Sequence, residues 1–254
     1  MNWEPIWPWL LGAEHETLRI AGVPTLLAEH LLYVVGPVIA AVALALPIGL
    51  WVGHVNRGGT LAVNISNAGR AIPSLGLILM AYLVFGLSSI PVFLTLIAMA
   101  IPPILTNTYV GVREVDPEVR DAAAGMGMSG WQILRRVEIP MALPVIMAGI
   151  RTSAVQVVAT ATLAAFVGLG GLGRPIFTGL ATSVQFNPDA RTVVVVAVVL
   201  VALFAIAVEQ ALGVAERLVV PRGLVAGHSQ DGSPPTDADV RPMGRSAEQS
   251  TVTA

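Results

Sequence analysis

Long apolar runs dominate the chain and recur along most of its length. Four of them approach the roughly 20 residues that a helix needs to cross a bilayer. A fifth run, residues 72–87, is shorter and gains length from the preceding residues 61–68. The pattern therefore predicts an all-α integral membrane protein with about five transmembrane helices. The four longer runs are residues 31–53, 90–112, 143–167 and 192–208.

A polar segment, residues 113–140, separates two of these runs and carries helix signals of its own. Asp116 followed by Pro117 is typical of a helix start, because the aspartate caps the first turn and proline lacks only an N–H that would be free there. Gly125 and Gly127 indicate where this helix ends. The first half of the segment therefore predicts a short helix closed by a glycine turn.

The second half of the segment predicts another short helix. Ser129 and Gln132 have the spacing of a capping box, and we expect the helix to stop before Pro140. The alanines at 122–124 form a small face that another surface can approach closely. Asp121, with the nearby arginines, offers directional polar pairing. This arrangement suits a module presented to a soluble partner.

Composition supports the membrane setting and the charges suggest an orientation. The chain is 55% hydrophobic and 12% charged, whereas a soluble domain carries about 25% charged residues. None of the 14 basic residues is lysine, so arginine alone carries any positive-inside bias. If the polar segment is cytoplasmic, most arginines at span ends lie inside. They are Arg57, Arg70, Arg113, Arg120, Arg135, Arg136, Arg217 and Arg222, against Arg19, Arg174 and Arg191 outside.

The chain divides into three parts. Residues 1–30 are acidic and are expected to form an external N-terminal segment. Residues 31–225 form the membrane domain, with a polar loop at 113–143. Residues 226–254 are rich in Gly, Ser, Pro, Asp and Thr and are expected to form a disordered cytoplasmic tail. In the first part, Trp3, Trp7 and Trp9 fit either an interfacial belt or packing on a neighbouring subunit.

Absent residue types exclude several chemistries. Without lysine the chain has no phosphate-binding loop of the Walker type, so it cannot itself be such an ATPase. Without cysteine it has neither thiolate nucleophiles nor thiolate metal sites. The histidines show no metal-ligand spacing, and each is expected to be solvated or interfacial. They are His15, His30, His54 and His228.

Two motifs resemble nucleotide or DNA sites but have the wrong context. Gly168, Gly170 and Gly173 satisfy G-x-G-x-x-G, with Asp189 at about the distance of a ribose-binding acid. They follow an apolar run and not a strand, so we expect a tight turn. The polar segment also resembles a DNA-binding helix-turn-helix. Spans on both sides leave no room for a third helix, and the net charge of −2 gives no excess for phosphate.

The polar segment resembles the signature of the transmembrane permease subunits of binding-protein-dependent ABC importers, Glu-Ala-Ala, three residues, Gly, nine residues, Ile-x-Leu-Pro. Both spacings match here. Aspartate replaces glutamate, valine replaces isoleucine and isoleucine replaces leucine, which keeps charge or shape. The resemblance implies that this loop docks into the ATP-hydrolysing subunit. The matching residues are Asp121, Ala122, Ala123, Gly127, Val137, Ile139 and Pro140.

Two further stretches, residues 70–75 and 164–173, resemble permeases for osmoprotectants: glycine betaine, choline, carnitine or proline. The glycine-rich stretch is also similar to methionine and phosphonate importers. The resemblance implies the type I importer permease fold with a five-span core. It also implies a second permease subunit, a dimer of ATP-binding subunits and an extracytoplasmic substrate-binding protein. Homodimer and heterodimer both stay open.

The resemblance implies that this chain is no enzyme and has no cofactor, because the partner subunit binds ATP and magnesium. It implies a multi-pass protein of the bacterial cell membrane, with the N-terminus outside and the C-terminus in the cytoplasm. The resemblance also implies that the protein has no nucleic-acid partner. Candidate residues along the substrate path are polar groups within spans, although the threonines also suit helix–helix hydrogen bonds. They are Asn107, Gln156, Thr160 and Thr162.

Two other classes of function are weaker. A proton-coupled secondary transporter normally carries buried carboxylates within its spans. No aspartate or glutamate occurs between His30 and Arg113 or between Ala142 and Pro188. A membrane scaffold without transport would bind the ATPase subunit while changes in the spans left substrate flux unaffected.

Overall fold

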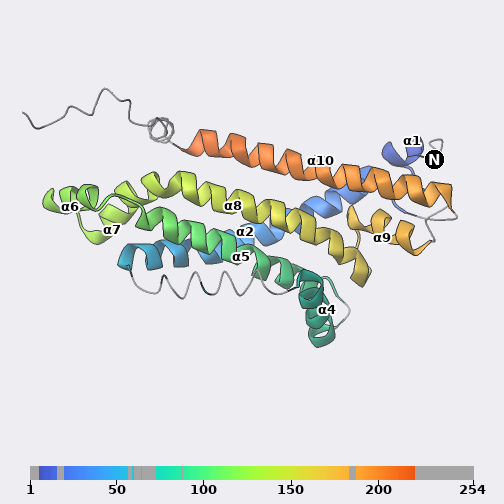
Figure 1. Ribbon diagram of the computed structural model, residues 1–254, viewed down its shortest axis with the longest axis horizontal. Coiled ribbons are helices and arrows are strands. Elements are labelled where there is room, and N and C mark those ends of the chain that lie inside the picture. Colours follow the sequence, from blue (N-terminus) through green and yellow to red (C-terminus); the bar gives the residue numbers. More distant parts are fainter. Residues whose placement is uncertain are drawn as a thin grey trace, which may run out of the picture.

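The computed structural model describes residues 6–15, 20–56, 59, 64, 73–86, 88–182 and 187–220. Within these ranges the chain is helical and has no strand beyond an isolated bridge between His15 and Ile20. The long helices lie roughly along the long axis of the molecule (Figure 1). The elements are α1 (Ile6–Leu10), α2 (Val23–Val55), α4 (Ser74–Phe85), α5 (Ile90–Arg113), α6 (Pro117–Gly125), α7 (Gly130–Ile133), η1 (Leu134–Glu138), α8 (Ile139–Ala161), η2 (Thr162–Val167), α9 (Gly173–Ala181) and α10 (Pro188–Val219).

Four helical stretches of the described residues are long and apolar enough to cross a membrane: α2, α5, Gly130–Val167 and α10. They correspond to the four longer apolar runs, but three of them extend well beyond the expected bounds. The third begins at Gly130 and not at residue 143. α2 begins at Val23 and not at residue 31, and α10 continues to Val219 and not to residue 208. The expected fifth span appears as the 12-residue helix α4. Most of the apolar run before it lies outside the described residues.

Small residues bring α2 and α5 into close contact. A Cβ atom added at Gly49 of α2 would lie 2.7 Å from the Cβ of Thr108 on α5. At Gly53 it would lie equally close, 2.7 Å, to the Cβ of Val112. Between lipid-facing helices association depends on van der Waals packing, which small residues make possible over long contacts. The buried small residues of α2 recur every fourth position: Ala41, Ala45, Gly49 and Gly53.

α8 packs on the other side of α5 by the same means. A Cβ atom at Gly149 would lie 2.5 Å from the Cβ of Asn107. A buried hydrogen bond adds a polar link, since the Ser153 hydroxyl donates to the Ala100 carbonyl at 3.0 Å. α2, α5 and α8 therefore enclose the main apolar core, which includes Val34, Leu96, Ile104, Val157 and Val158.

α10 covers the bundle with only part of its surface. Large apolar side chains point away from the rest of the chain along most of its length, as suits a lipid-facing or subunit-facing helix. Near its C-terminal end Glu216 pairs with Arg151 of α8. The exposed apolar residues of α10 include Val195, Val198, Val199, Leu203 and Ile206.

The N-terminal residues pack on their own chain. Trp9 is fully buried, and its indole Nε1 donates to the Ala21 carbonyl at 2.8 Å. It shares an apolar cluster with Leu172 and with Ala190 at the start of α10. Neither alternative for the tryptophans therefore holds for Trp9. Trp7 is 67% exposed, as an interfacial residue would be, and Trp3 lies outside the described residues.

The glycine-rich stretch forms a turn between η2 and α9, as expected. Gly168 and Gly171 have φ values of 82° and 78°. The Glu29 carboxylate of α2 accepts a hydrogen bond from the Gly171 N–H at 2.7 Å. Helix η2, and not a strand, precedes the turn, so the dinucleotide-binding motif is excluded.

A matched pair of glycine substitutions tests the α2–α5 contact. Gly49→Ala places a methyl group 2.7 Å from Thr108, whereas at Gly76 of α4 the nearest atom is an ordinary 3.7 Å away. Because alanine favours a helix over glycine by about 1 kcal/mol, Gly76→Ala should leave the midpoint of thermal unfolding in detergent unchanged or higher. Gly49→Ala should lower it, since overpacking costs about 1–3 kcal/mol. Equal midpoints would contradict the close contact.

Candidate functional site: the polar loop between α5 and α8

The polar loop lies at one end of the helix bundle. α6 and α7 project beyond the last turns of α2 and α5, while α9 and the start of α10 lie at the opposite end (Figure 1). The chain leaves α5 after Arg113 and enters α8 at Ile139. The loop is therefore placed where a partner outside the membrane can reach it.

The start of α6 follows the sequence signals. Asp116 is the N-cap, and its carboxylate accepts a hydrogen bond from the Glu118 N–H at 2.8 Å. Pro117 occupies the first helical position, where the missing N–H has no intrahelical acceptor in any case. The predicted helix start is confirmed.

The end of α6 depends on Gly127. This residue has φ of 82°, and its N–H donates to the Ala124 carbonyl at 2.9 Å. The next N–H, of Met128, donates to the Ala123 carbonyl at 3.2 Å. These two bonds form a Schellman motif, whose left-handed residue is normally glycine.

The capping box of α7 is present, but the helical structure that begins there does not stop before Pro140. The Ser129 N–H donates to the Gln132 side chain at 2.8 Å. Helical structure then continues through a π-helical turn, η1, into α8, with Pro140 in the first turn of α8. The Ile139 N–H bonds to the Leu134 carbonyl, five residues back. This wider turn moves the preceding carbonyls away from the proline ring, which would clash in an uninterrupted α-helix.

The signature residues divide into an exposed face and a packed side. Asp121, Ala122 and Gly127 are exposed. Ala123 is buried beneath them, so only part of the small alanine face is available to a partner. The C-terminal part of the signature is half-buried where η1 enters α8. It comprises Val137, Ile139 and Pro140.

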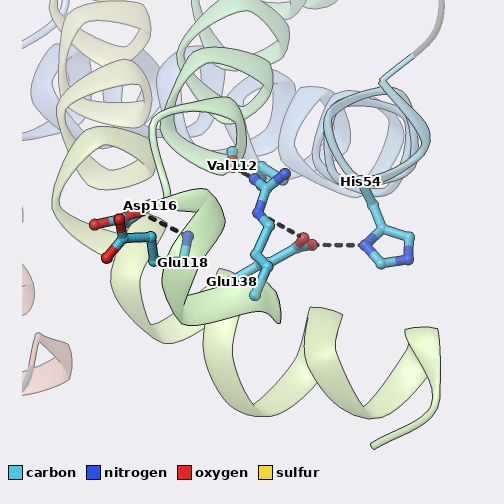
Figure 2. Close-up of polar contacts among 6 residues, drawn as sticks. His54, Val112, Asp116, Glu118 and Glu138 are labelled. Atoms are coloured by element: carbon cyan, nitrogen blue, oxygen red, sulfur yellow. Dashed lines mark hydrogen bonds and ion pairs between the residues drawn. The ribbon is translucent and has the colours of Figure 1, made fainter. Parts of the chain in front are cut away.

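Glu138, the unspecified position of the signature, is the buried centre of the loop. Its side chain is only 2% exposed and points toward α2 (Figure 2). One carboxylate oxygen lies 2.7 Å from Nδ1 of His54, and the other lies 3.1 Å from Nε of Arg120. Arg120 also donates to the Val112 carbonyl in the last turn of α5. Three helical elements, α2, α6 and η1, therefore meet at one carboxylate, and Arg120 links it to α5.

The expectation that every histidine is solvated or interfacial is wrong. His54 pairs with Glu138, and its ring lies 3.3 Å from the position a Cβ would take at Gly130. His15 and His30 are fully buried, whereas His228 lies outside the described residues. An ionised carboxylate only accepts hydrogen bonds, so with Glu138 ionised the donor in this pair would be Nδ1 of His54.

The candidate path residues do not form one cluster. Asn107 donates to the Pro103 carbonyl of its own helix at 2.8 Å and packs on Gly149 of α8. Thr160 donates to the Gln156 carbonyl at 2.9 Å, which is again within α8. From Gly149 to Thr160 a helix rises about 16 Å. The set is therefore spread along α8.

Among the described residues, the threonines also do not make the helix–helix hydrogen bonds considered for them. Thr162 donates to the Ala159 carbonyl at 2.6 Å, three residues back, and Thr160 bonds within its helix as well. Short polar side chains satisfy themselves on a nearby carbonyl in this way when no partner helix offers an acceptor.

A family model described as "Binding-protein-dependent transport system inner membrane component" matches residues 45–220, which include the whole polar loop. The chain belongs to this family. It is the permease subunit of a binding-protein-dependent ABC importer. The permease is a transport component and a multi-pass membrane protein.

Curated relatives of the permease are similar over most of their length. The glycine betaine/carnitine/choline transport system permease protein OpuCB of Bacillus subtilis is 36% identical over 196 residues, 77% of this chain and 88% of that protein. The carnitine transport permease protein OpuCB of Listeria monocytogenes is also 36% identical, over 77% of this chain and 87% of that protein. The osmoprotectant import permease protein OsmY of Salmonella typhimurium is 32% identical, over 68% of this chain and 74% of that protein.

The permease has the fold of a solved importer. It superimposes on a chain of the MetNI methionine ABC transporter, in an inward-facing conformation, with a TM-score of 0.66. The match covers 87% of this chain and 100% of that one, at 22% sequence identity. The type I importer permease fold is therefore confirmed.

Two glycines of the loop provide a sensitive test of its geometry. No atom lies within 4 Å of a Cβ added at Gly125 or Gly127, but only Gly127 has a positive φ. Gly127→Val should therefore strain the turn and abolish uptake while membrane insertion remains intact. Gly125→Val should retain most uptake, measured in cells at equal permease abundance. Full uptake with Gly127→Val would contradict a role for the turn.

Proposed function

We propose that this permease imports a compatible solute of the quaternary-ammonium class, such as glycine betaine, choline or carnitine, with proline as a further candidate. The observation that carries this proposal is the naming of the relatives. Those 31–36% identical are permeases for these solutes or for osmoprotectants in general. The methionine importer shares only the fold at 22% identity, so it gives no support for methionine as substrate.

We propose that a separate ATP-binding subunit docks on the exposed face of the loop. Asp121 offers a carboxylate there, and Ala122 offers a small contact surface. Arg135 and Arg136 of η1 and Trp131 of α7 are also exposed. An exposed aromatic residue beside charged groups is typical of a protein interface. The ATPase pair would bind ATP and magnesium, and this chain would bind neither.

We propose that the end of the bundle that carries the polar loop faces the cytoplasm. The N-terminus would then lie outside the cell membrane and the C-terminus in the cytoplasm. Arg113, Arg120, Arg135 and Arg136 gather at this end. Arg174 lies on α9 at the opposite end (Figure 1). The excess of arginine at the loop agrees with the positive-inside rule.

The remaining parts of the complex follow from the importer class. A second permease subunit, identical or similar, would complete the path, and an extracytoplasmic binding protein would deliver the solute. Asn107, Gln156 and Thr162 are half-buried in the single chain, so a second subunit can still approach them. We propose these residues, with Thr160, as lining for that path.

Uptake measurements test the substrate. Labelled glycine betaine, choline, carnitine, proline and methionine are supplied to cells with and without this permease, at low and high salt. We expect the deletion to lose uptake of at least one quaternary-ammonium solute and to keep methionine uptake. Loss of methionine uptake alone would overturn the proposed substrate class.

A charge reversal tests the docking face. Asp121→Arg should reduce recovery of the ATP-binding subunit in pull-downs, because the exposed carboxylate is replaced by a cation. Glu114→Arg makes the same charge change at an exposed residue before α6 and serves as the control. If Asp121→Arg recovers as much ATPase subunit as the control, the carboxylate is not a docking contact.

A further inference from the structure

Glu138 is unusual for a carboxylate, because it is 1% exposed and lies at the end of a membrane bundle. A buried carboxylate loses its hydration and is tolerated only when cations or donors replace the water. Here His54 and Arg120 supply one contact to each oxygen. The two partners come from α2 and α6, which are separated by more than 60 residues of sequence.

The position of Glu138 depends on the π-helical turn. In a regular helix each residue is rotated by about 100° from the one before it. The extra residue of η1 therefore changes the side of the helix on which Glu138 lies relative to α7. π-helical turns often occur at functional sites, and here the turn aims the only buried acid of the described residues between α2 and α6.

α6 lies between the proposed docking face and Glu138. Its exposed face carries Asp121 and Ala122, whereas the neighbouring Arg120 turns inward to Glu138 and to the Val112 carbonyl. Val112 is the residue against which Gly53 of α2 packs. A displacement of α6 therefore acts on the last turn of α5 and on α2 at a point where these helices are in close contact.

We propose that Glu138 is a positioning residue that couples the loop to the transmembrane helices. Its carboxylate holds α6 and the C-terminal end of α2 as one unit, so movement of α6 displaces α2 and α5. This inference rests on the proposed docking of the ATP-binding subunit for its role in transport. The mechanical link itself exists in the permease alone.

The first experiment measures the link without substrate or ATPase. The chain has no cysteine, so introduced cysteines are the only thiols that a spin label can modify. Val55→Cys allows a label at the end of α2, and Val119→Cys allows one on α6. Both positions are partly exposed, at 39% and 38%. The distance distribution between the labels is recorded for the full chain in lipid nanodiscs. Glu138→Gln, which keeps the shape and removes the charge, should broaden it.

The matched control removes the other carboxylate of a helix–helix ion pair. Glu216→Gln breaks the contact between α10 and Arg151 of α8, away from the loop. It should leave the distribution unchanged. An unchanged distribution in Glu138→Gln, or equal broadening in both variants, would overturn the proposal. If Glu138→Gln fails to accumulate, His54→Leu, which removes the polar group of α2 that contacts the carboxylate, should broaden the distribution in its place.

The second experiment measures transport. In the reconstituted complex, Glu138→Gln should still bind the ATP-binding subunit but should import about tenfold less solute per ATP hydrolysed, within the range of usual coupling energies. Glu216→Gln should stay near the wild-type ratio, and adding His54→Gln to Glu138→Gln should cause no further loss. A wild-type ratio in Glu138→Gln would overturn the proposal. If the wild-type complex imports none of the solutes, the substrate proposal fails, and the spin-label result decides on Glu138.

Discussion

The close contact between α2 and α5 is the constraint on which the rest of the structure depends. The hydrophobic effect does not drive apolar helices together inside a bilayer, so their association depends on close van der Waals packing. Gly49 and Gly53 allow α5 to approach until Thr108 and Val112 fill the space where side chains would stand. α8 then packs on the far side of α5 through Gly149. The ends of these helices form the platform from which the polar loop projects.

The polar loop has two faces with different surroundings. Asp121, Ala122 and Gly127 face outward, where a partner subunit can contact them. Ala123 and Glu138 are buried, and Glu138 contacts the end of α2 through His54. A short helix that is exposed on one face and held by a buried ion pair on the other moves as a rigid part. This is the property that a coupling element between two proteins requires.

Charged side chains are few in the membrane domain, and the ion pairs of Glu138 and Glu216 have different surroundings. The pair of Arg151 and Glu216 joins α8 to α10 and is partly exposed, at 35% and 25% of the side chains, so water weakens its contribution. Glu138 is buried and accepts contacts on both oxygens. Loss of His54 or Arg120 leaves one oxygen of a buried carboxylate without its partner, whereas Arg151 and Glu216 stay partly hydrated when their contact is lost.

Local signals in the sequence determined the helical spans, the start of α6 at Asp116, the turn at Gly127 and the capping box at Ser129. Each of these depends on residues within about one helical turn, so neighbouring sequence is sufficient. Only the tertiary structure decided the continuation through Pro140, the burial of Trp9 and the pairing of Glu138 with His54. Those outcomes depend on residues far apart in the chain, since a carboxylate at an unspecified position can be identified as buried only when helices from three regions enclose it.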